Sequence, residues 1–147
     1  MSNIGIDLGN VFTSKFEPFP HVFPNAFEVV NQLVKLFNNT YIISRVNDKQ
    51  RERAKEWFKA IDFFNKTGIK EENVYFCFDR RDKAIFIKGL NIDYFIDDRA
   101  DVMRHLPEKT IKLLFNPTKD LDIINNLKYC HVVNNWAEIA KYFRLTK

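Results

Sequence analysis

At residues 94–102 the chain reads YFIDDRADV, a short apolar run that ends in two adjacent aspartates. Similar runs, rich in Ile, Val, Tyr and Phe, occur at Asn3–Leu8, Thr40–Ser44, Asn73–Phe78, Tyr94–Asp97, Thr110–Phe115 and Cys130–Val133. Continuous rather than alternating hydrophobicity is typical of strands that are buried on both faces, as in a parallel sheet. We therefore predict a strand at each of these ranges.

Helical patterns separate the apolar runs. Asn25 and Glu28 have the spacing of a capping box, which predicts a helix that begins there and ends near residue 38 or 39. A second helix is expected over residues 48–66, with Asn47 as its N-cap and Gly68 ending it. Shorter helices are expected at Asp82–Gly89, Ala100–Leu106 and Asn135–Phe143. This alternation predicts an α/β fold, a three-layer α/β/α sandwich around a Rossmann-like, mainly parallel sheet.

Length and composition restrict the class of protein. A chain of 147 residues that is 46% hydrophobic fits a single domain over residues 1–147, with a sizeable core. Its apolar stretches are far shorter than the roughly 20 residues that span a bilayer, so no membrane segment is expected. The N-terminus lacks the features of a secretory signal, which favours a cytoplasmic location. The net charge of +4 permits a polyanionic partner and leaves nucleic acid as a weak alternative.

Cysteine and histidine give little evidence for a soft-metal site. Cys77 and Cys130 lie in apolar runs, so two buried free thiols are expected rather than a disulfide or a metal pair. His21, His105 and His131 do not have the spacing of zinc ligands. The charges on the polar face of the 48–66 helix are mixed in sign, with Glu residues interspersed among Lys and Arg, which favours a solvated surface over a phosphate-binding one.

Polar residues follow several predicted strands at the carboxyl ends, where open parallel sheets bind ligands. Taken singly, each has a structural explanation: a helix cap for the aspartates, a loop position for Ser44, and a surface ion pair with Asp79 or Asp82 for Lys83. Taken together, they point to a shared site. Carboxylates about 4 Å apart repel by about 4 kcal/mol at an effective dielectric near 20, and a hard cation such as Mg²⁺ offsets this repulsion. A lysine at a helix N-terminus is opposed by the helix dipole, which a bound phosphate would reconcile.

The order Asp7, Ser44, Lys83, Asp97–Asp98 resembles that of the haloacid dehalogenase superfamily of phosphohydrolases, over about Ile4–Val102. The resemblance implies that Asp7 attacks phosphorus to form an aspartyl-phosphate. It implies that Lys83 neutralises the nucleophile and the phosphoryl group, which Ser44 also binds. Receiver domains use similar groups, but in the opposite order along the chain.

The resemblance also implies a bound metal and further ligands. The residues that would hold Mg²⁺ are Asp7, Gly9 through its carbonyl, Asp97 and Asp98, with Asp101 as an outer partner. Asn10 is expected to contribute to phosphate binding. Most small-molecule phosphatases of the family carry a cap domain, but the intervals 10–24 and 45–82 leave little room for one, so an open site is expected. The loop Lys15–Pro24 is expected either to cover this site as a flap or to pack on the core.

Gly9 departs from the family pattern, which usually has a second Asp two residues after the nucleophile. A glycine keeps the carbonyl that binds magnesium but lacks the side chain that protonates the leaving group. General acid–base catalysis of this kind contributes about 10²- to 10⁴-fold. Asn10 and His21 are candidates for a replacement polar group.

Three functional hypotheses follow, all with a phosphorylated partner that ranges from a small molecule to a macromolecule. The first is a Mg²⁺-dependent phosphatase that acts through an aspartyl-phosphate. The second is a catalytically impaired pseudo-enzyme that binds a phosphorylated ligand or protein. The third is a nucleotide or nucleic-acid-end phosphatase, which the basic charge, the missing cap and the aromatic loop favour.

Overall fold

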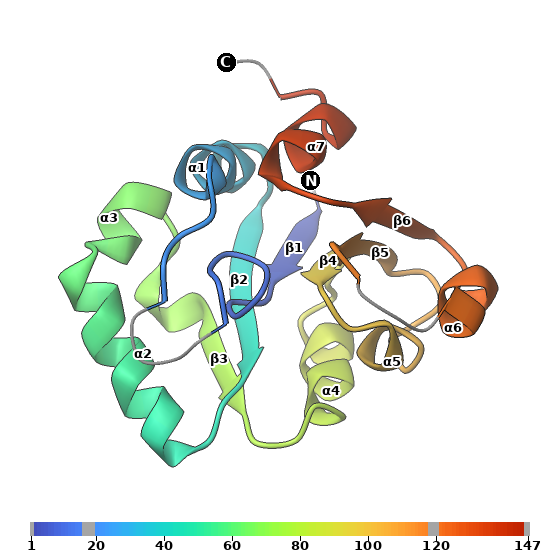
Figure 1. The fold of residues 1–147 in the computed structure, drawn as a ribbon, viewed down its shortest axis with the longest axis horizontal. Coiled ribbons are helices and arrows are strands. Elements are labelled where there is room, and N and C mark those ends of the chain that lie inside the picture. Colours follow the sequence, from blue (N-terminus) through green and yellow to red (C-terminus); the bar gives the residue numbers. More distant parts are fainter. Residues whose placement is uncertain (1, 16–19, 118–120, 146–147) are drawn as a thin grey trace.

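The computed structural model describes residues 2–15, 20–117 and 121–145. These residues form a six-stranded sheet in which every neighbouring pair is parallel and the order is β3-β2-β1-β4-β5-β6 (Figure 1). The strands are β1 (Asn3–Ile6), β2 (Asn39–Arg45), β3 (Val74–Cys77), β4 (Tyr94–Asp97), β5 (Ile111–Phe115) and β6 (Cys130–Val133). The chain therefore builds outward in one direction as far as β3 and then returns to place β4 beside β1.

Helices cover both faces of the sheet, as Figure 1 shows. One apolar cluster joins a face of the sheet to α1 (Ala26–Leu36), α2 (Asp48–Ala60), α3 (Phe63–Thr67) and α7 (Trp136–Tyr142). The other face packs against α4 (Asp82–Gly89), α5 (Ala100–Met103) and α6 (Leu121–Asn126). A 3-10 helix, η1 (Glu71–Asn73), precedes β3. The predicted three-layer α/β/α sandwich is confirmed.

Burial on both faces explains the apolar character of the central strands. In β1, Ile4 and Ile6 are fully buried in the cluster with α1 and α7. Gly5 lies between them and faces the opposite layer, where a Cβ atom would lie 2.9 Å from Cδ1 of Phe95. The Phe95 ring thus occupies the space that a side chain at position 5 would need.

The predicted strands match the structure to within two residues at each end, but the helices differ more. The helix expected over 48–66 is interrupted between α2 and α3, because Asp62 adopts the left-handed conformation with φ 56°. Helix α5 ends at Met103, earlier than expected, and α6 and η1 were not predicted.

The two predicted N-caps have different outcomes. Asn47 caps α2 as expected: its side chain accepts from the Gln50 N–H at 2.8 Å, and the Gln50 side chain accepts from the Asn47 N–H at 2.9 Å. The capping box predicted at Asn25 is wrong. Asn25 has φ 68° and makes no side-chain cap hydrogen bond, because its left-handed backbone directs the chain into α1.

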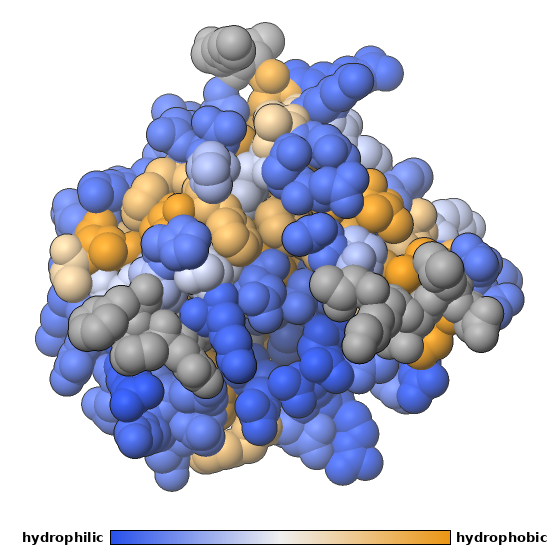
Figure 2. Space-filling view, viewed as in Figure 1, coloured by the Kyte–Doolittle hydropathy of each residue, from blue (hydrophilic) through white to orange (hydrophobic). Residues whose placement is uncertain are grey.

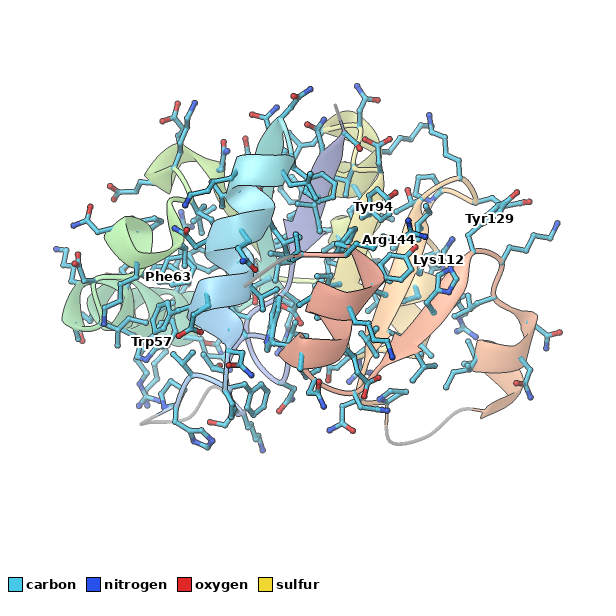
Figure 3. The ribbon with its side chains drawn as sticks, turned by 90° about the horizontal axis from the view of Figure 1, so that it is seen from above. Trp57, Phe63, Tyr94, Lys112, Tyr129 and Arg144 are labelled. Atoms are coloured by element: carbon cyan, nitrogen blue, oxygen red, sulfur yellow. The ribbon has the colours of Figure 1, made fainter. Side chains whose placement is uncertain are left out.

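Aromatic rings fill the layer formed by α1, α2, α3 and α7. Phe12 is fully buried and lies edge-on to the rings of Phe27, Phe63 and Trp136 at centroid distances of 5.3, 5.3 and 6.2 Å. Trp57 and Phe63 lie next to each other in Figure 3, with ring centroids 6.1 Å apart. Phe12 belongs to the loop after β1, so this cluster anchors that loop to the core.

Two smaller expectations concern membranes and cysteines. Among the described residues, no helix combines the length and the apolar character that crossing a bilayer requires. Cys77 and Cys130 are both free thiols, as predicted, although only Cys77 is fully buried and Cys130 is partly exposed.

Candidate active site

Asp7 directly follows β1, at the point where the strand order reverses between β1 and β4. Its backbone N–H donates to the carbonyl of Ile96 at 3.0 Å, which holds Asp7 against β4. Only 6% of the residue is exposed. In open α/β sheets, ligands bind outside the carboxyl ends of the strands at such a reversal, so Asp7 lies where a ligand is expected.

Lys83 lies in the first turn of α4 and is almost completely buried. Its Nζ atom is 2.7 Å from Oδ2 of Asp97 and 3.4 Å from Oδ2 of Asp7. The alternative of a surface pair with Asp79 or Asp82 is therefore wrong. Burial lowers the pKa of Lys83, but the charges of Asp7 and Asp97 outweigh it, so the pKa lies above its usual value and the ammonium group stays charged.

The two carboxylates at the end of β4 have different partners. Oδ1 of Asp97 accepts hydrogen bonds from the backbone N–H groups of Asp98 at 2.7 Å and Arg99 at 3.2 Å, and its Oδ2 accepts from Lys83. Asp98 instead lines a cavity together with Asp7. Asp101, expected as an outer partner of a metal, forms an ion pair with Arg99 at 2.8 Å.

The structure brings Asp7, Asp97 and Asp98 together. One carboxylate oxygen of each lies within 4.8 Å of the others, although the residues come from distant parts of the chain. Burial, and then the negative charge of Asp97, raise the pKa of Asp98 to about 8. Burial also raises the pKa of Asp7 to about 6, against the opposing effect of Lys83. The site therefore carries more negative charge than Lys83 alone compensates.

These raised pKa values predict that the metal-free protein loses stability as pH rises. The carboxyls of Asp7 and Asp98 hold their protons to about pH 6 and about pH 8 in the folded state, compared with 3.8 ordinarily. The folded state thus binds more protons than the unfolded state between these values, and its stability falls from about pH 4 towards pH 8. Urea unfolding at pH 5, 6.5 and 8, with EDTA or with Mg²⁺, measures this dependence.

The effect of Mg²⁺ at two pH values and the variant Asp98→Asn test whether the carboxylates cause this pH dependence. Mg²⁺ is expected to stabilise the protein more at pH 8 than at pH 5, because protons compete with the metal for the same oxygens. Asp98→Asn is expected to reduce both the decline above pH 6.5 and the effect of Mg²⁺. An unchanged decline in Asp98→Asn would show that other groups cause it.

The cavity beside Asp7 and Asp98 has a volume of about 330 Å³. Its wall includes Ser44, Gly9 and Asn10, the remaining residues that the sequence singled out. A hydrogen bond from the Ser44 side chain lowers the pKa of Asp7 against the effect of burial. Asn10 is exposed and adopts the left-handed conformation with φ 64°. All the predicted site residues thus lie at one place, with Asp97 buried behind the cavity.

The wall also contains residues that the sequence analysis did not identify. These residues are Arg45, Val46, Gln50, Arg80 and Arg99, whereas Lys15, which also lines the wall, begins the loop that was expected to act as a flap. Arg45 ends β2 beside Ser44, and Arg80 lies in the loop after β3, so the rule that located Ser44 and Lys83 also applies to them. On the face shown in Figure 2, hydrophilic residues predominate in the lower centre, near the region where Figure 1 places the loops after β2 and β3.

The core fixes the loop between Asp7 and Thr13. The Leu8 carbonyl accepts hydrogen bonds from the backbone N–H groups of Val11, Phe12 and Thr13 at 2.8 to 3.1 Å, forming a tight turn. The indole N–H of Trp136 donates to the Val11 carbonyl at 2.8 Å. Phe12 and Trp136 are fully buried. The loop that carries Gly9 and Asn10 is therefore held to the core by the Phe12 side chain and by the backbone carbonyl of Val11.

The loop Lys15–Pro24 was expected either to cover the site or to pack on the core. Phe16, Glu17, Pro18 and Phe19 lie outside the described residues. Phe23 stacks on Phe115 with ring centroids 5.9 Å apart, so this end of the loop packs on the core. His21 is exposed and lies edge-on to Phe23, whereas Lys15 lines the cavity.

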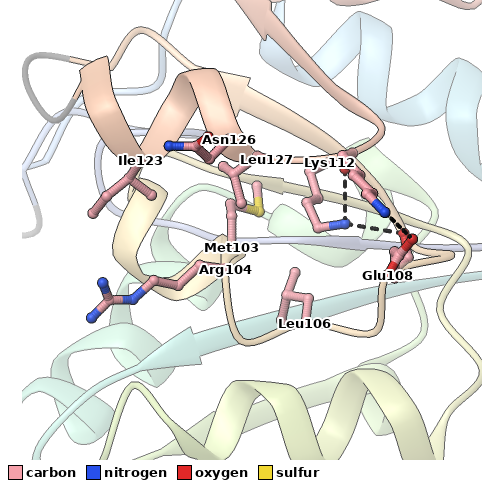
Figure 4. A pocket seen from close by; sticks show the side chains of 9 residues that line it. Met103, Arg104, Leu106, Glu108, Lys112, Ile123, Asn126 and Leu127 are labelled. Carbon is pink, nitrogen blue, oxygen red and sulfur yellow. Dashed lines mark hydrogen bonds and ion pairs between the residues drawn. The ribbon is translucent and has the colours of Figure 1, made fainter.

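A second hollow of about 560 Å³ lies at the other end of the sheet (Figure 4). Lys112, near the beginning of β5, is buried there, and its Nζ donates to the carbonyls of Pro107, Glu108, Thr110 and Lys128. Burial lowers the pKa of Lys112. Lys112 connects loops at the amino end of the sheet, and the hollow lies apart from the three aspartates.

The chain is similar in sequence to two bacterial proteins. No protein-family model matches the chain. It is 27% identical over 120 residues to a protein of Oceanobacillus iheyensis named "Putative nucleotidase", covering 82% of this chain and 60% of that protein. It is 23% identical over 133 residues to a "Putative nucleotidase" of Bacillus cereus, covering 90% of this chain and 64% of that protein. The chain thus spans less than two thirds of the length of these relatives.

Solved structures match the whole described fold. A D,D-heptose 1,7-bisphosphate phosphatase from B. bronchiseptica, complexed with magnesium and phosphate, aligns with a TM-score of 0.72 and 11% identity over 98% of both chains. The chain has the haloacid dehalogenase-like fold. A cobalt-bound deoxy-D-mannose-octulosonate 8-phosphate phosphatase from Haemophilus influenzae aligns with a TM-score of 0.62 and 10% identity, over 97% of this chain and 86% of that one.

Two features of this haloacid dehalogenase-like fold bear on the chemistry of the site. Within the described residues no cap domain interrupts the fold, because only α2, α3 and η1 lie between β2 and β3. Gly9 stands in the cavity wall two residues after Asp7. The family resemblance expected from the motif order is confirmed at the level of the fold.

Proposed function

We propose that this protein is a phosphatase of the haloacid dehalogenase type that hydrolyses a small phosphorylated molecule. The buried contact of Lys83 with both Asp7 and Asp97, beside a cavity that Ser44 also lines, carries the proposal. A cavity of about 330 Å³ is at the lower end of the range for small-molecule sites, about 300 to 1,000 Å³. The names of the two relatives make nucleotides one candidate class of substrate.

The donor set of the site fits Mg²⁺. This ion prefers hard oxygen ligands, and it is usually held by one or two carboxylates together with substrate phosphate and water. Asp7, Asp97 and Asp98 offer three carboxylate oxygens within 4.8 Å of one another. Since Asp97 also accepts hydrogen bonds from Lys83 and from two backbone N–H groups, Asp7 and Asp98 would provide most of the coordination, with the Gly9 carbonyl as a further ligand. When bound, Mg²⁺ would neutralise charge on the carboxylates and on the phosphoryl oxygens.

Asp7 is the proposed nucleophile. Its free carboxylate oxygen attacks phosphorus, and the bond from phosphorus to the leaving oxygen breaks with its electron pair on that oxygen. Lys83 keeps Asp7 ionised by direct charge contact and balances the charge on the transferring group, while Ser44 and Asn10 donate hydrogen bonds to phosphoryl oxygens. The leaving oxygen takes its proton from solvent. Water then attacks phosphorus of the aspartyl-phosphate, the bond between phosphorus and the Asp7 oxygen breaks, and inorganic phosphate leaves with the Asp7 carboxylate regenerated.

Gly9 favours a second candidate, a pseudo-enzyme that binds a phosphorylated ligand without efficient turnover. Gly9 lies in the cavity wall and brings no titratable group to the leaving group. His21, a candidate replacement, is on the exposed loop and is not among the described residues that line the cavity. An active enzyme with this site would act best on esters whose leaving group needs no proton, such as aryl or acyl phosphates.

Turnover decides between the two candidates. We expect Mg²⁺-dependent release of p-nitrophenol from p-nitrophenyl phosphate, and release of phosphate from acetyl phosphate, at rates well above those of Asp7→Asn. Mononucleotides and sugar phosphates complete the panel and test the substrate class. Equal rates for the wild-type protein and Asp7→Asn on every compound would contradict a phosphatase that uses Asp7, and would favour the binding protein.

A further inference from the structure

The wall of the active-site cavity carries arginines that the proposed chemistry does not use. Arg45 is the last residue of β2, and Arg80 lies in the loop between β3 and α4. Both line the cavity that contains Asp7 and Asp98. Arginine suits the binding of phosphate, because its planar guanidinium group donates two parallel hydrogen bonds.

Three other cations in or near the site, Lys83, Arg99 and Arg81, are paired with carboxylates. Lys83 contacts Asp97 and Asp7, and Arg99 pairs with Asp101 at 2.8 Å. Arg81, which neighbours Arg80 in the chain, pairs with Asp79 at 2.9 Å. Of these three, Lys83 and Arg99 line the cavity, and only Lys83 also contacts Asp7, the proposed nucleophile.

Arg45 and Arg80 are not matched in this way. Within the part of the chain that the structure describes, the Arg80 side chain takes part in no hydrogen bond or ion pair. Arg45 donates from Nε to the Phe78 carbonyl at 3.1 Å, and its terminal nitrogens have no hydrogen-bond partner among the same residues. The Phe78 contact fixes the stem of Arg45 while leaving two N–H₂ groups free to donate.

A single phosphate monoester does not need both arginines. Its two negative charges are already met by Lys83, by a hydrogen bond from the Ser44 hydroxyl, and by the cation that Asp7 and Asp98 fit. The guanidinium groups of Arg45 and Arg80 therefore remain available for another anion in the same cavity.

We propose that Arg45 and Arg80 form a second anion-binding subsite, and that the substrate is a small molecule with a second phosphate group besides the one that reacts. The proposal rests on the phosphatase function above and adds the class of substrate. The second phosphate is held by the loops after β2 and β3, while the first meets Asp7 at the end of β1.

The test compares paired substrates that differ by one phosphate. The pairs are fructose 1,6-bisphosphate with fructose 6-phosphate, and adenosine 3′,5′-bisphosphate with adenosine 5′-monophosphate. Because a hydrogen bond to a charged group contributes about 1.5 to 3 kcal/mol, we expect kcat/KM to favour the bisphosphate of at least one pair by about 10- to 150-fold. Arg80→Gln is expected to reduce that ratio by about 10-fold or more, and Arg80→Lys by less, because lysine keeps the charge but not the planar fork.

Arg81→Gln is the matched control, since Arg81 is exposed, adjacent in the chain and paired with Asp79 outside the cavity. It is expected to leave the ratio unchanged. Equal kcat/KM values within both pairs, or an equal loss in Arg80→Gln and Arg81→Gln, would overturn the subsite while the phosphatase function stands. A third pair, 3-phosphoglycerate with glycerol 3-phosphate, replaces the second phosphate by a carboxylate. A preference that appears only for 3-phosphoglycerate in this pair would assign the arginines to a carboxylate and overturn the proposal.

A binding measurement separates failure of the subsite from failure of the phosphatase function. Calorimetric titration of Asp7→Asn with Mg²⁺ and each member of the two pairs requires no turnover. Tighter binding of a bisphosphate that Arg80→Gln in the same background abolishes would support the subsite even if no compound were hydrolysed. If Asp7→Asn and the Asp7→Asn/Arg80→Gln double variant bind each bisphosphate with equal dissociation constants, the subsite is contradicted.

Discussion

Asparagine in place of Asp7 is expected to abolish turnover without weakening the fold. The amide has the shape of the carboxylate but cannot attack phosphorus, so kcat should fall by about 10⁴-fold or more, as when the nucleophile of other covalent hydrolases is removed. The pKa of Asp7 is raised to about 6, which means that Asp7 is still mainly ionised at neutral pH but that its charge is less favourable in the folded protein than in the unfolded chain. Removing that charge should leave the urea midpoint of the metal-free protein at pH 8 unchanged or higher, since Lys83 keeps its 2.7 Å contact with Asp97.

Phosphate-release assays and urea unfolding on the same preparations provide both readouts. Asp48→Asn is a suitable control, because Asp48 is an exposed residue in the first turn of α2. It should retain full activity. An Asp7→Asn protein that is clearly less stable than wild type at pH 8 would indicate a structural role for Asp7, and one that remains active would remove Asp7 from the nucleophile position.

Aspartate in place of Gly9 is expected to raise activity on esters with poor leaving groups. A carboxyl group two residues after the nucleophile would supply the proton that the leaving oxygen needs, and such general acid catalysis contributes about 10²- to 10⁴-fold. Among the glycines of the described residues, positive φ is recorded only for Gly68, so a side chain at position 9 would not be strained by a left-handed backbone. We expect kcat/KM for mononucleotides and sugar phosphates to increase within this range.

The leaving group provides an internal control for this substitution. kcat/KM for p-nitrophenyl phosphate should change little, because nitrophenolate departs without a proton and this constant reports only the steps up to the aspartyl-phosphate. Gly9→Asn adds a side chain of the same size without a titratable group and should not reproduce the gain. Equal gains for Asp and Asn, or for aryl and alkyl esters, would rule out general acid catalysis as the cause.

Strand positions could be predicted from local sequence because burial on both faces leaves a continuous apolar signal. Tyr94–Asp97 and Cys130–Val133 have the predicted bounds. The long helix over 48–66 could not be divided correctly, because the apolar pattern continues through the break: Phe58 and Phe63 pack in one cluster although Asp62 turns the chain between them. Helix α6 was not predicted, because the sequence around it is polar and lacks a helical apolar pattern.

Asp7, Ser44 and Asp97 could be predicted as site residues because a single rule selects them: polar residues follow the ends of strands. The same rule applies to Arg45 and Arg80, but neither differs in sequence from an ordinary surface arginine. What distinguishes them is their place in the cavity wall and, for Arg80, that no carboxylate among the described residues pairs with it, whereas the neighbouring Arg81 pairs with Asp79. Ion pairs depend on side-chain geometry, which spacing along the chain does not specify.

The amino-acid sequence by itself determined the class of fold and which residues are available for chemistry, because apolar runs and strand-end polar groups are local properties. Only the tertiary structure decided how those groups are partnered. It placed Lys83 between Asp97 and Asp7, and it set Asp98 in the cavity wall while Asp97 is fully buried. The physical reason is that charge balance in a buried site depends on distances of a few ångströms between segments far apart in the chain, and these distances exist only once the sheet has formed.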